Sequence, residues 1–182
     1  MPSPVAHTLA GVVAFELLHP RAEDRVTHKS WQLLLPWIIL PSLPDIDYFL
    51  SYLLYNDPRV LHGGITHTLG FAILFSLFLV PWKIFGSSLA TFGIALSLLA
   101  SHLLLDMATG KTIGLSSGVG VMLFFPFSEE RVSFPLILFI GPRHRTFYDW
   151  FRIENAIGII WELLMFAPIL FFLRNFRQKA KA

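Results

Sequence analysis

Histidine and aspartate recur in four short segments of this otherwise apolar chain, and both residue types bind divalent cations. The segments are Ala6-His7-Thr8, Pro44-Asp45-Ile46-Asp47, His62-Gly63-Gly64-Ile65-Thr66-His67, and Ser101-His102 with Asp106. An ionisable side chain is costly inside an apolar bundle unless it faces a partner, water or an ion. We therefore predict one cation-binding cluster, whose candidate ligands are His7, Asp45, Asp47, His62, His67, His102 and Asp106.

The spacing within these segments leaves alternatives open. His102 and Asp106 are four residues apart in a helical run, so they share one face and could grip one cation or hydrogen-bond each other at a helix end. Asp45 and Asp47 follow a proline, so we expect an extended turn in which they bind different metals, or one orients a neighbouring histidine, or both cap a helix. Each histidine alone could equally be a satisfied interfacial side chain.

The composition indicates a membrane protein. Hydrophobic residues make up 54% of the 182 residues and charged residues 14%, against roughly 25% charged in soluble domains. The mean hydropathy is +0.62. A net charge of +2 predicts no nucleic-acid partner. With no cysteine in the chain, a metal must be held by imidazoles and carboxylates; we expect two ions, zinc being favoured and manganese or magnesium the alternatives.

Apolar runs predict where the chain crosses the bilayer. Residues 84–105 include no Asp, Glu, Lys or Arg, and residues 68–82 are nearly all apolar. We predict that these two segments span the membrane as an antiparallel hairpin, and that residues 155–173 form the last span. The hairpin would bring His67, His102 and Asp106 to the same side of the membrane.

We predict that residues 1–182 form one membrane-embedded domain, which is an all-α, multi-pass bundle of the inner or plasma membrane. We expect an amphipathic or partly embedded helix near the N-terminus, and a short helix over residues 31–43 that dips into the bilayer and ends at Asp45, because prolines interrupt it. Residues 21–29 are expected as a surface loop, residues 107–150 as re-entrant or interfacial pieces, and residues 174–182 as a frayed basic tail.

The order of the motifs resembles a known family. The His-Thr near the start, Leu-Pro-Asp-Ile-Asp, His-Gly-Gly-Ile-Thr-His-Thr and Ser-His-Leu-Leu-Leu-Asp-Met-Ala-Thr are similar to the YdjM-like predicted membrane-bound metal-dependent hydrolases. Phe-Phe-Pro-Phe-Ser at residues 124–128, followed by Arg131, resembles the Pro-Phe segment of that family. The resemblance implies a helical core distantly similar to zinc-dependent phospholipase C and related single-strand nucleases. It implies as ligands His7, Asp45 or Asp47, His67, His102 and Asp106, with His62 nearby, and His144 and Glu154 as stand-ins at a third metal.

These observations together predict a membrane-bound metal-dependent hydrolase, most plausibly a phosphoesterase on a lipid or lipid-linked substrate. Asp45 or Asp47 would orient or deprotonate the attacking water. Four arginines could contact a headgroup or phosphate, or be interfacial charges: Arg59, Arg143, Arg145 and Arg152. Glu162, inside the last span, either supports a ligand histidine, lines a polar passage or is a hydrogen-bonded acid packed on another helix. A non-catalytic adaptor with a structural metal site and a divalent-ion transporter are the alternatives, and the oligomeric state stays open.

Overall fold

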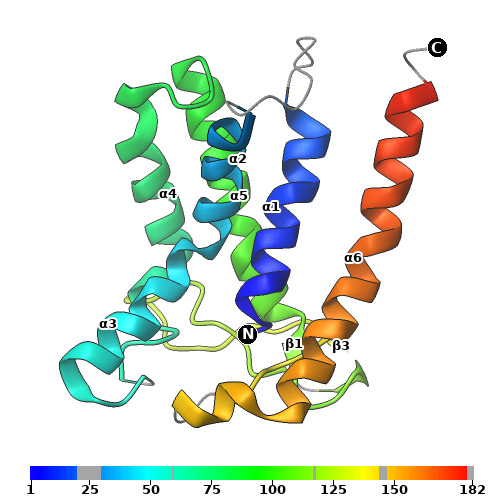
Figure 1. The fold of residues 1–182 in the computed structure, drawn as a ribbon. Helices are drawn as coiled ribbons and strands as arrows, with labels where there is room; N and C mark the ends of the chain where they lie inside the picture. Colours follow the sequence, from blue (N-terminus) through cyan, green and yellow to red (C-terminus); the bar gives the residue numbers. More distant parts are fainter. Residues whose placement is uncertain (20–29, 59, 117, 144–146, 180–182) are drawn as a thin grey trace.

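The computed structural model describes residues 1–19, 30–58, 60–116, 118–143 and 147–179, and it is mostly helical (Figure 1). Its helices are α1 (Pro4–Leu18), α2 (Ser30–Ile39), α3 (Ile46–Tyr55), α4 (Leu69–Leu79), α5 (Ser88–Met107) and α6 (Ile153–Lys179). Short 3₁₀ helices are η1 (Leu40–Asp45), η2 (Ile65–His67), η3 (Val80–Trp82) and η4 (Phe147–Phe151). The strands are β1 (Thr109–Gly110), β2 (Gly114–Leu115), β3 (Leu136–Ile137) and β4 (Phe139–Ile140). The chain predicted as a surface loop, residues 21–29, lies outside the described residues.

Among the described residues, three helical segments are long and apolar enough to cross a membrane: Leu33–Tyr55, Ser88–Met107 and Ile153–Phe176. The last two agree with the predicted spans. Leu69–Trp82, which we predicted as a span, is one of two shorter apolar helical segments; Pro4–Leu18 is the other.

Helices α4 and α5 form the predicted hairpin, and they pack against each other along their length (Figure 1). Each helix starts at a hydroxyl N-cap: the Thr68 side chain accepts from the Phe71 N–H at 3.0 Å, and the Ser87 side chain accepts from the Ala90 N–H at 3.1 Å. Such caps satisfy backbone donors that lack a partner in the first turn. The hairpin places the start of α4 and the end of α5 at the same end of the bundle.

Helix α1, the predicted N-terminal helix, packs among the other helices of the bundle. It contacts α2, α5, α6 and η1. Gly11 explains the close approach to α2, because a Cβ at this position would lie 1.8 Å from the Trp37 carbonyl oxygen. How deeply α1 is embedded in a bilayer stays a prediction.

The segment that we predicted to end at Asp45 continues. Pro41 and Pro44 lack the backbone N–H groups that an α-helix would use as donors. The chain therefore forms η1 there before it continues as α3. Pro36 is accommodated inside α2. The prolines therefore redirect the helix without ending it, and Asp47 lies in the first turn of α3 instead of an extended turn.

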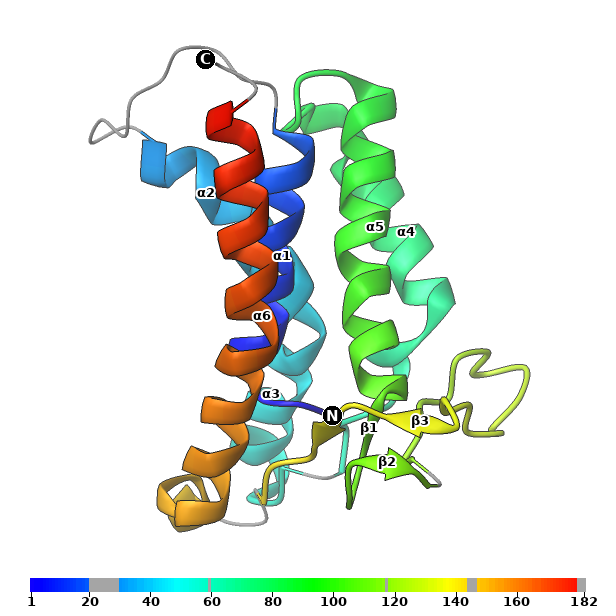
Figure 2. The ribbon, with the colours of Figure 1, turned by 90° about the vertical axis from the view of Figure 1, so that its right-hand side faces the viewer.

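Between α5 and α6 the described chain is mostly irregular and includes four two-residue strands. Strand β1 pairs with β4 in parallel, and β2 pairs with β3 antiparallel. These short pairs depart from the all-α prediction, although the class remains mostly helical. Helix α6 runs unbroken past Pro168 to Lys179, so the described part of the predicted frayed tail is helical. The N-terminus lies near the end of α5, and α6 carries the C-terminus to the opposite end (Figures 1 and 2).

Candidate metal centre

Side chains from α1, η1, η2 and α5 converge where these elements meet. His102 Nε2 lies 3.4 Å from Asp106 Oδ2, and His7 Nε2 lies 3.5 Å from Asp106 Oδ1. His67 Nε2 lies 3.7 Å from Asp106 Oδ2. Asp45 lies on the other side of the same three imidazoles, at 3.5 Å from His67, 3.7 Å from His102 and 3.9 Å from His7. Five predicted ligands therefore surround one point.

The first potential metal-binding group, called here the inner group, consists of His7, His102 and Asp106. All three side chains are fully buried. His102 and Asp106 are one turn apart on α5, as their spacing predicted, and the His7 ring stacks on the His102 ring with centroids 3.8 Å apart. Two regular helices thus hold this group.

The second potential metal-binding group, called here the outer group, consists of Asp45, His62 and His67. Its members come from η1, η2 and the loop between α3 and η2. The side chains of Asp45 and His62 are 15% and 10% exposed, whereas that of His67 is fully buried. The outer group is thus the part of the cluster that can be reached from outside.

Asp47 holds the outer histidines in place. Its Oδ1 accepts from His62 Nδ1 at 2.7 Å, and its Oδ2 accepts from His67 Nδ1 at 3.1 Å. The Gly63 backbone N–H, at 3.3 Å, and the Thr66 hydroxyl also donate to Oδ2. Gly63 has φ +78°, a left-handed conformation that glycine adopts without strain. Asp47 therefore resembles the carboxylates that orient metal-binding histidines from behind.

His102 is oriented in the same way by backbone. Its Nδ1–H donates to the Pro41 carbonyl oxygen at 2.7 Å. A carbonyl can only accept, so this bond assigns the proton to Nδ1 and leaves the Nε2 lone pair facing the cluster. The η1 turn therefore supplies Asp45 and also orients His102.

Several buried polar atoms of the cluster lack a hydrogen-bond partner: both nitrogens of His7, the Nε2 atoms of His67 and His102, and both carboxylate oxygens of Asp106. An unsatisfied buried polar group costs about 1–3 kcal/mol, and more when it is charged. Tetrahedral zinc with bonds of about 2.0–2.1 Å separates its ligand atoms by about 3.3–3.4 Å. The distances of 3.4–3.7 Å from Asp106 to the three imidazoles approach this value, so the donor set fits a cation.

The charges around His67 also favour a bound cation. Burial disfavours the charged form of His67, but the neighbouring carboxylates of Asp45, Asp47 and Asp106 outweigh burial and raise the pKa of His67 to about 9. The carboxylates thus stabilise positive charge at this imidazole. A cation bound there would take the place of that proton.

Other predicted residues lie apart from both groups. Arg143 pairs with Glu154 at 3.3 Å, and Arg152 pairs with Asp149 at 2.6 Å; neither group includes any of the four. Arg59, Arg145 and His144 lie outside the described residues. Glu162 is 1% exposed; its Oε1 accepts from the Ser3 N–H at 2.7 Å and its Oε2 from the Ser3 hydroxyl. Glu162 is therefore a hydrogen-bonded acid that anchors the N-cap of α1, one turn before His7.

Sequence reasoning did not identify three of the supporting groups. The Pro41 carbonyl has no side-chain signal. Ser3 precedes Pro4, a common helix start that could have marked it as an N-cap, but its partner Glu162 is 159 residues away. Thr66 lies next to the predicted ligand His67. Of the three supporting groups, its hydroxyl is the one that lies within a predicted motif.

Comparison with known proteins agrees with the ordered motifs. A family model described as YdjM inner membrane protein matches residues 1–180, which confirms the predicted family. No curated protein and no solved structure gives a match. The expected likeness of the core to phospholipase C and single-strand nucleases therefore stays a prediction.

Proposed function

We propose that this chain, which belongs to the YdjM inner membrane protein family, is a metal-dependent hydrolase that cleaves phosphoesters of lipids or lipid-linked molecules. The observation that carries the proposal is the convergence of buried, unpaired imidazole nitrogens and carboxylate oxygens on one point. Two groups of histidine and aspartate, the inner one buried and the outer one partly exposed, could hold metal ions, and the remainder of the proposal concerns what such ions would do.

The inner group would hold one cation and the outer group a second. Asp45 lies within 3.9 Å of histidines from both groups, as expected of a carboxylate shared between two ions. Zinc is the favoured metal because of the imidazole share, with manganese or magnesium as alternatives. When bound, the metal would supply Lewis acidity, which acidifies a water molecule and offsets negative charge on a phosphoryl group.

The chain's own residues then divide the remaining work. Asp45 is the partly exposed carboxylate, so it is placed to orient the attacking water and accept its proton. Asp47 has four donors on its two oxygens, which suits an orienting role better than proton transfer. His102, held by the Pro41 carbonyl, and His67, held by Asp47, keep their Nε2 atoms directed at the cation.

The location of the cluster supports a membrane substrate. The cluster lies at the start of α1 and near the end of α5, a candidate span, and Asp45 joins it from η1, where prolines interrupt the candidate span Leu33–Tyr55. A site at a helix end lies near the headgroups of a bilayer, where phosphoesters of lipids are found. The same position argues against ion transport, for which sites near the bilayer midplane are typical.

Metal analysis combined with turnover tests the proposal. We would measure metal bound to the protein purified in detergent, then hydrolysis of a soluble aryl phosphate and of phosphatidic acid in vesicles, with Asp106→Asn as the inactive variant. About two equivalents of metal, with hydrolysis lost in the variant, supports the hydrolase. One equivalent without turnover favours an adaptor with a structural site, and metal flux into protein-loaded vesicles favours a transporter.

A further inference from the structure

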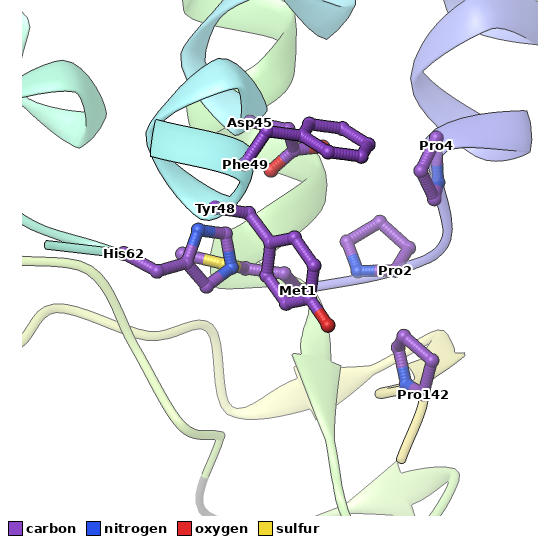
Figure 3. Close-up of a pocket in the computed structure, with 8 residues that line it drawn as sticks. All are labelled: Met1, Pro2, Pro4, Asp45, Tyr48, Phe49, His62 and Pro142. Carbon is purple, nitrogen blue, oxygen red and sulfur yellow. The ribbon is translucent and has the colours of Figure 1, made fainter. Parts of the chain in front are cut away.

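A small pocket leads from the surface to the cluster between α3 and the first residues of the chain (Figure 3). Called here the side pocket, it is lined by Met1, Pro2, Pro4, Asp45, Tyr48, Phe49, His62 and Pro142. Asp45 and His62 are its only lining residues from the two metal-binding groups, and they are also the partly exposed ones. The side pocket is therefore where the cluster meets its surroundings.

The side chains that line the side pocket are apolar, apart from Asp45, His62 and the Tyr48 hydroxyl. Figure 3 shows Tyr48 and Phe49 from α3 on one side and Pro2, Pro4 and Pro142 on the other, with Met1 overlapping Tyr48 in this view. Among the described residues that line it there is no lysine or arginine. A sugar or base next to the scissile group would exchange its hydrogen bonds to water for few partners here, whereas a hydrocarbon would gain by burial.

The size of the side pocket supports the same reading. Its volume is about 50 Å³, whereas pockets that enclose a whole small molecule measure about 300–1,000 Å³. A soluble substrate would therefore remain mostly unenclosed. A lipid needs only its scissile end enclosed, because the bilayer surrounds the rest of the molecule.

The side pocket opens onto an apolar face of α3. Ile46, Phe49 and Leu53 are spaced three and four residues apart on one side of the helix, and they are 57%, 70% and 80% exposed. A contiguous exposed apolar face marks a membrane or partner contact, and α3 belongs to the candidate span Leu33–Tyr55. Phe49 belongs both to this face and to the pocket wall, so the two surfaces are continuous.

Two larger cavities do not place a substrate on the cluster. An apolar groove of about 460 Å³ lies between α5 and α6, and a polar cavity of about 550 Å³ lies beside Glu162. Neither is lined by any residue of the two metal-binding groups.

We propose that the side pocket binds the hydrocarbon next to the phosphoester of a membrane lipid, and that the lipid enters sideways from the bilayer across the apolar face of α3. The inference rests on the proposed function for the reaction. It adds the route by which the lipid reaches the cluster and the site that binds its hydrocarbon. Phe49 is its specificity-determining residue, because it joins the bilayer-facing surface to the cluster.

Two serine variants form a matched pair for the test. Phe49→Ser removes a side chain from the pocket wall, whereas Phe171→Ser removes an equally exposed phenylalanine of α6 that belongs neither to the side pocket nor to the apolar face of α3. With the full-length protein in nanodiscs, we expect Phe49→Ser to lower kcat/KM for phosphatidic acid about tenfold, as the loss of one aromatic contact to the bound hydrocarbon predicts. Turnover of a soluble aryl phosphate should stay within about twofold, and Phe171→Ser should leave both substrates unchanged. Equal effects of the two variants, or equal loss on both substrates, would overturn the proposal.

A binding readout separates this inference from the proposed function. Phosphatidic acid with a photoreactive diazirine near the headgroup end of its acyl chain should label residues 1–4 and 48–49, and the labelling should fall in Phe49→Ser but not in Phe171→Ser. Labelling spread over the other helices without the pocket residues overturns the side pocket, even if phosphoesters are hydrolysed. Labelling of the pocket without hydrolysis of any phosphoester retains the binding site and refutes the proposed reaction.

Discussion

The two metal-binding groups differ in the backbone that carries them. The inner group comes from two regular helices, α1 and α5, and its three side chains are fully buried. The outer group comes from 3₁₀ turns and a loop, needs Asp47 to orient two of its members, and is partly exposed. Regular helices thus provide a rigid anchor for a cation, and irregular backbone provides access to it.

The largest effect is expected at the inner group. Asp106→Asn keeps the size of the side chain but removes a charge that faces three imidazoles. Loss of an orienting carboxylate typically weakens metal binding about 10–100-fold, and we expect loss of a direct ligand to exceed about 100-fold. Competition with a chromophoric chelator measures this affinity. An Asp106→Asn protein that binds metal as tightly as the native one would exclude the inner group as a site.

A smaller effect is expected for the residue behind the outer group. Asp47→Asn retains one acceptor but replaces the other with an N–H₂ donor, so one of the two histidines loses its orienting bond. We expect metal affinity to fall about 10–100-fold, with the metal of the inner group retained. The same chelator titration, fitted for two sites, separates the two losses. If Asp47→Asn were as damaging as Asp106→Asn, the division into a rigid and an accessible group would fail.

The hydrogen bonds between Ser3 and Glu162 offer a third comparison, because α1 contacts α6 near both ends of α1. Glu162→Gln leaves one Ser3 donor without an acceptor in a buried site, which costs about 1–3 kcal/mol, or roughly 2–10 °C in Tm for a chain of this size. The matched control is Glu16→Gln, which weakens the ion pair with Arg174, whose side chain is 63% exposed, and should cost less than about 1 kcal/mol.

Thermal unfolding in detergent measures both variants. Glu162→Gln should also weaken metal binding less than Asp47→Asn does, because Glu162 reaches His7 only through the start of α1. Equal Tm values for the two variants would show that the buried anchor does not stabilise α1.

The smallest effect concerns pH in the metal-free protein, and it belongs to the outer group. The pKa of His67 is raised to about 9 in the folded state, above its ordinary value of 6.5. The stabilisation is therefore fully present below pH 6.5 and is lost as the pH rises through about 9. The groups that face His67 are Asp45, Asp47, Asp106, His62 and His102.

In chelator-treated protein, Tm should fall by a few degrees between pH 6.5 and 9.5, and His67→Gln should flatten this dependence. A Tm that rises over this interval would contradict the sign of the electrostatic argument. Adding metal should also flatten it, because the cation takes the place of the proton.

Local patterns predicted how three of the candidate ligands, His67, His102 and Asp106, come together. The uncharged run over residues 84–105 predicted α5, and the four-residue spacing of His102 and Asp106 predicted a shared face. The hairpin of α4 and α5 predicted that His67 would reach the same end. These features depend on helix periodicity and chain reversal, which residue spacing and apolar runs indicate directly.

Features that depend on distant packing were not predictable in the same way. Gly11 permits contact with the Trp37 carbonyl, and this contact places α1 inside the bundle although its composition suits an interface as well. Prolines 41 and 44 indicated a break, but only packing decides whether the helix ends or turns. The bond from Ser3 to Glu162 and the two-residue strands likewise join segments that no local pattern connects.

Anomalous diffraction from crystals of the metal-loaded protein, recorded on both sides of the zinc absorption edge, tests the central claim most directly. We expect a peak about 2.0–2.2 Å from the Nε2 atoms of His7 and His102 and from an Asp106 oxygen, with a second peak beside Asp45 and His67. Diffraction from fully loaded crystals that shows no peak among these side chains would contradict a metal centre in this protein.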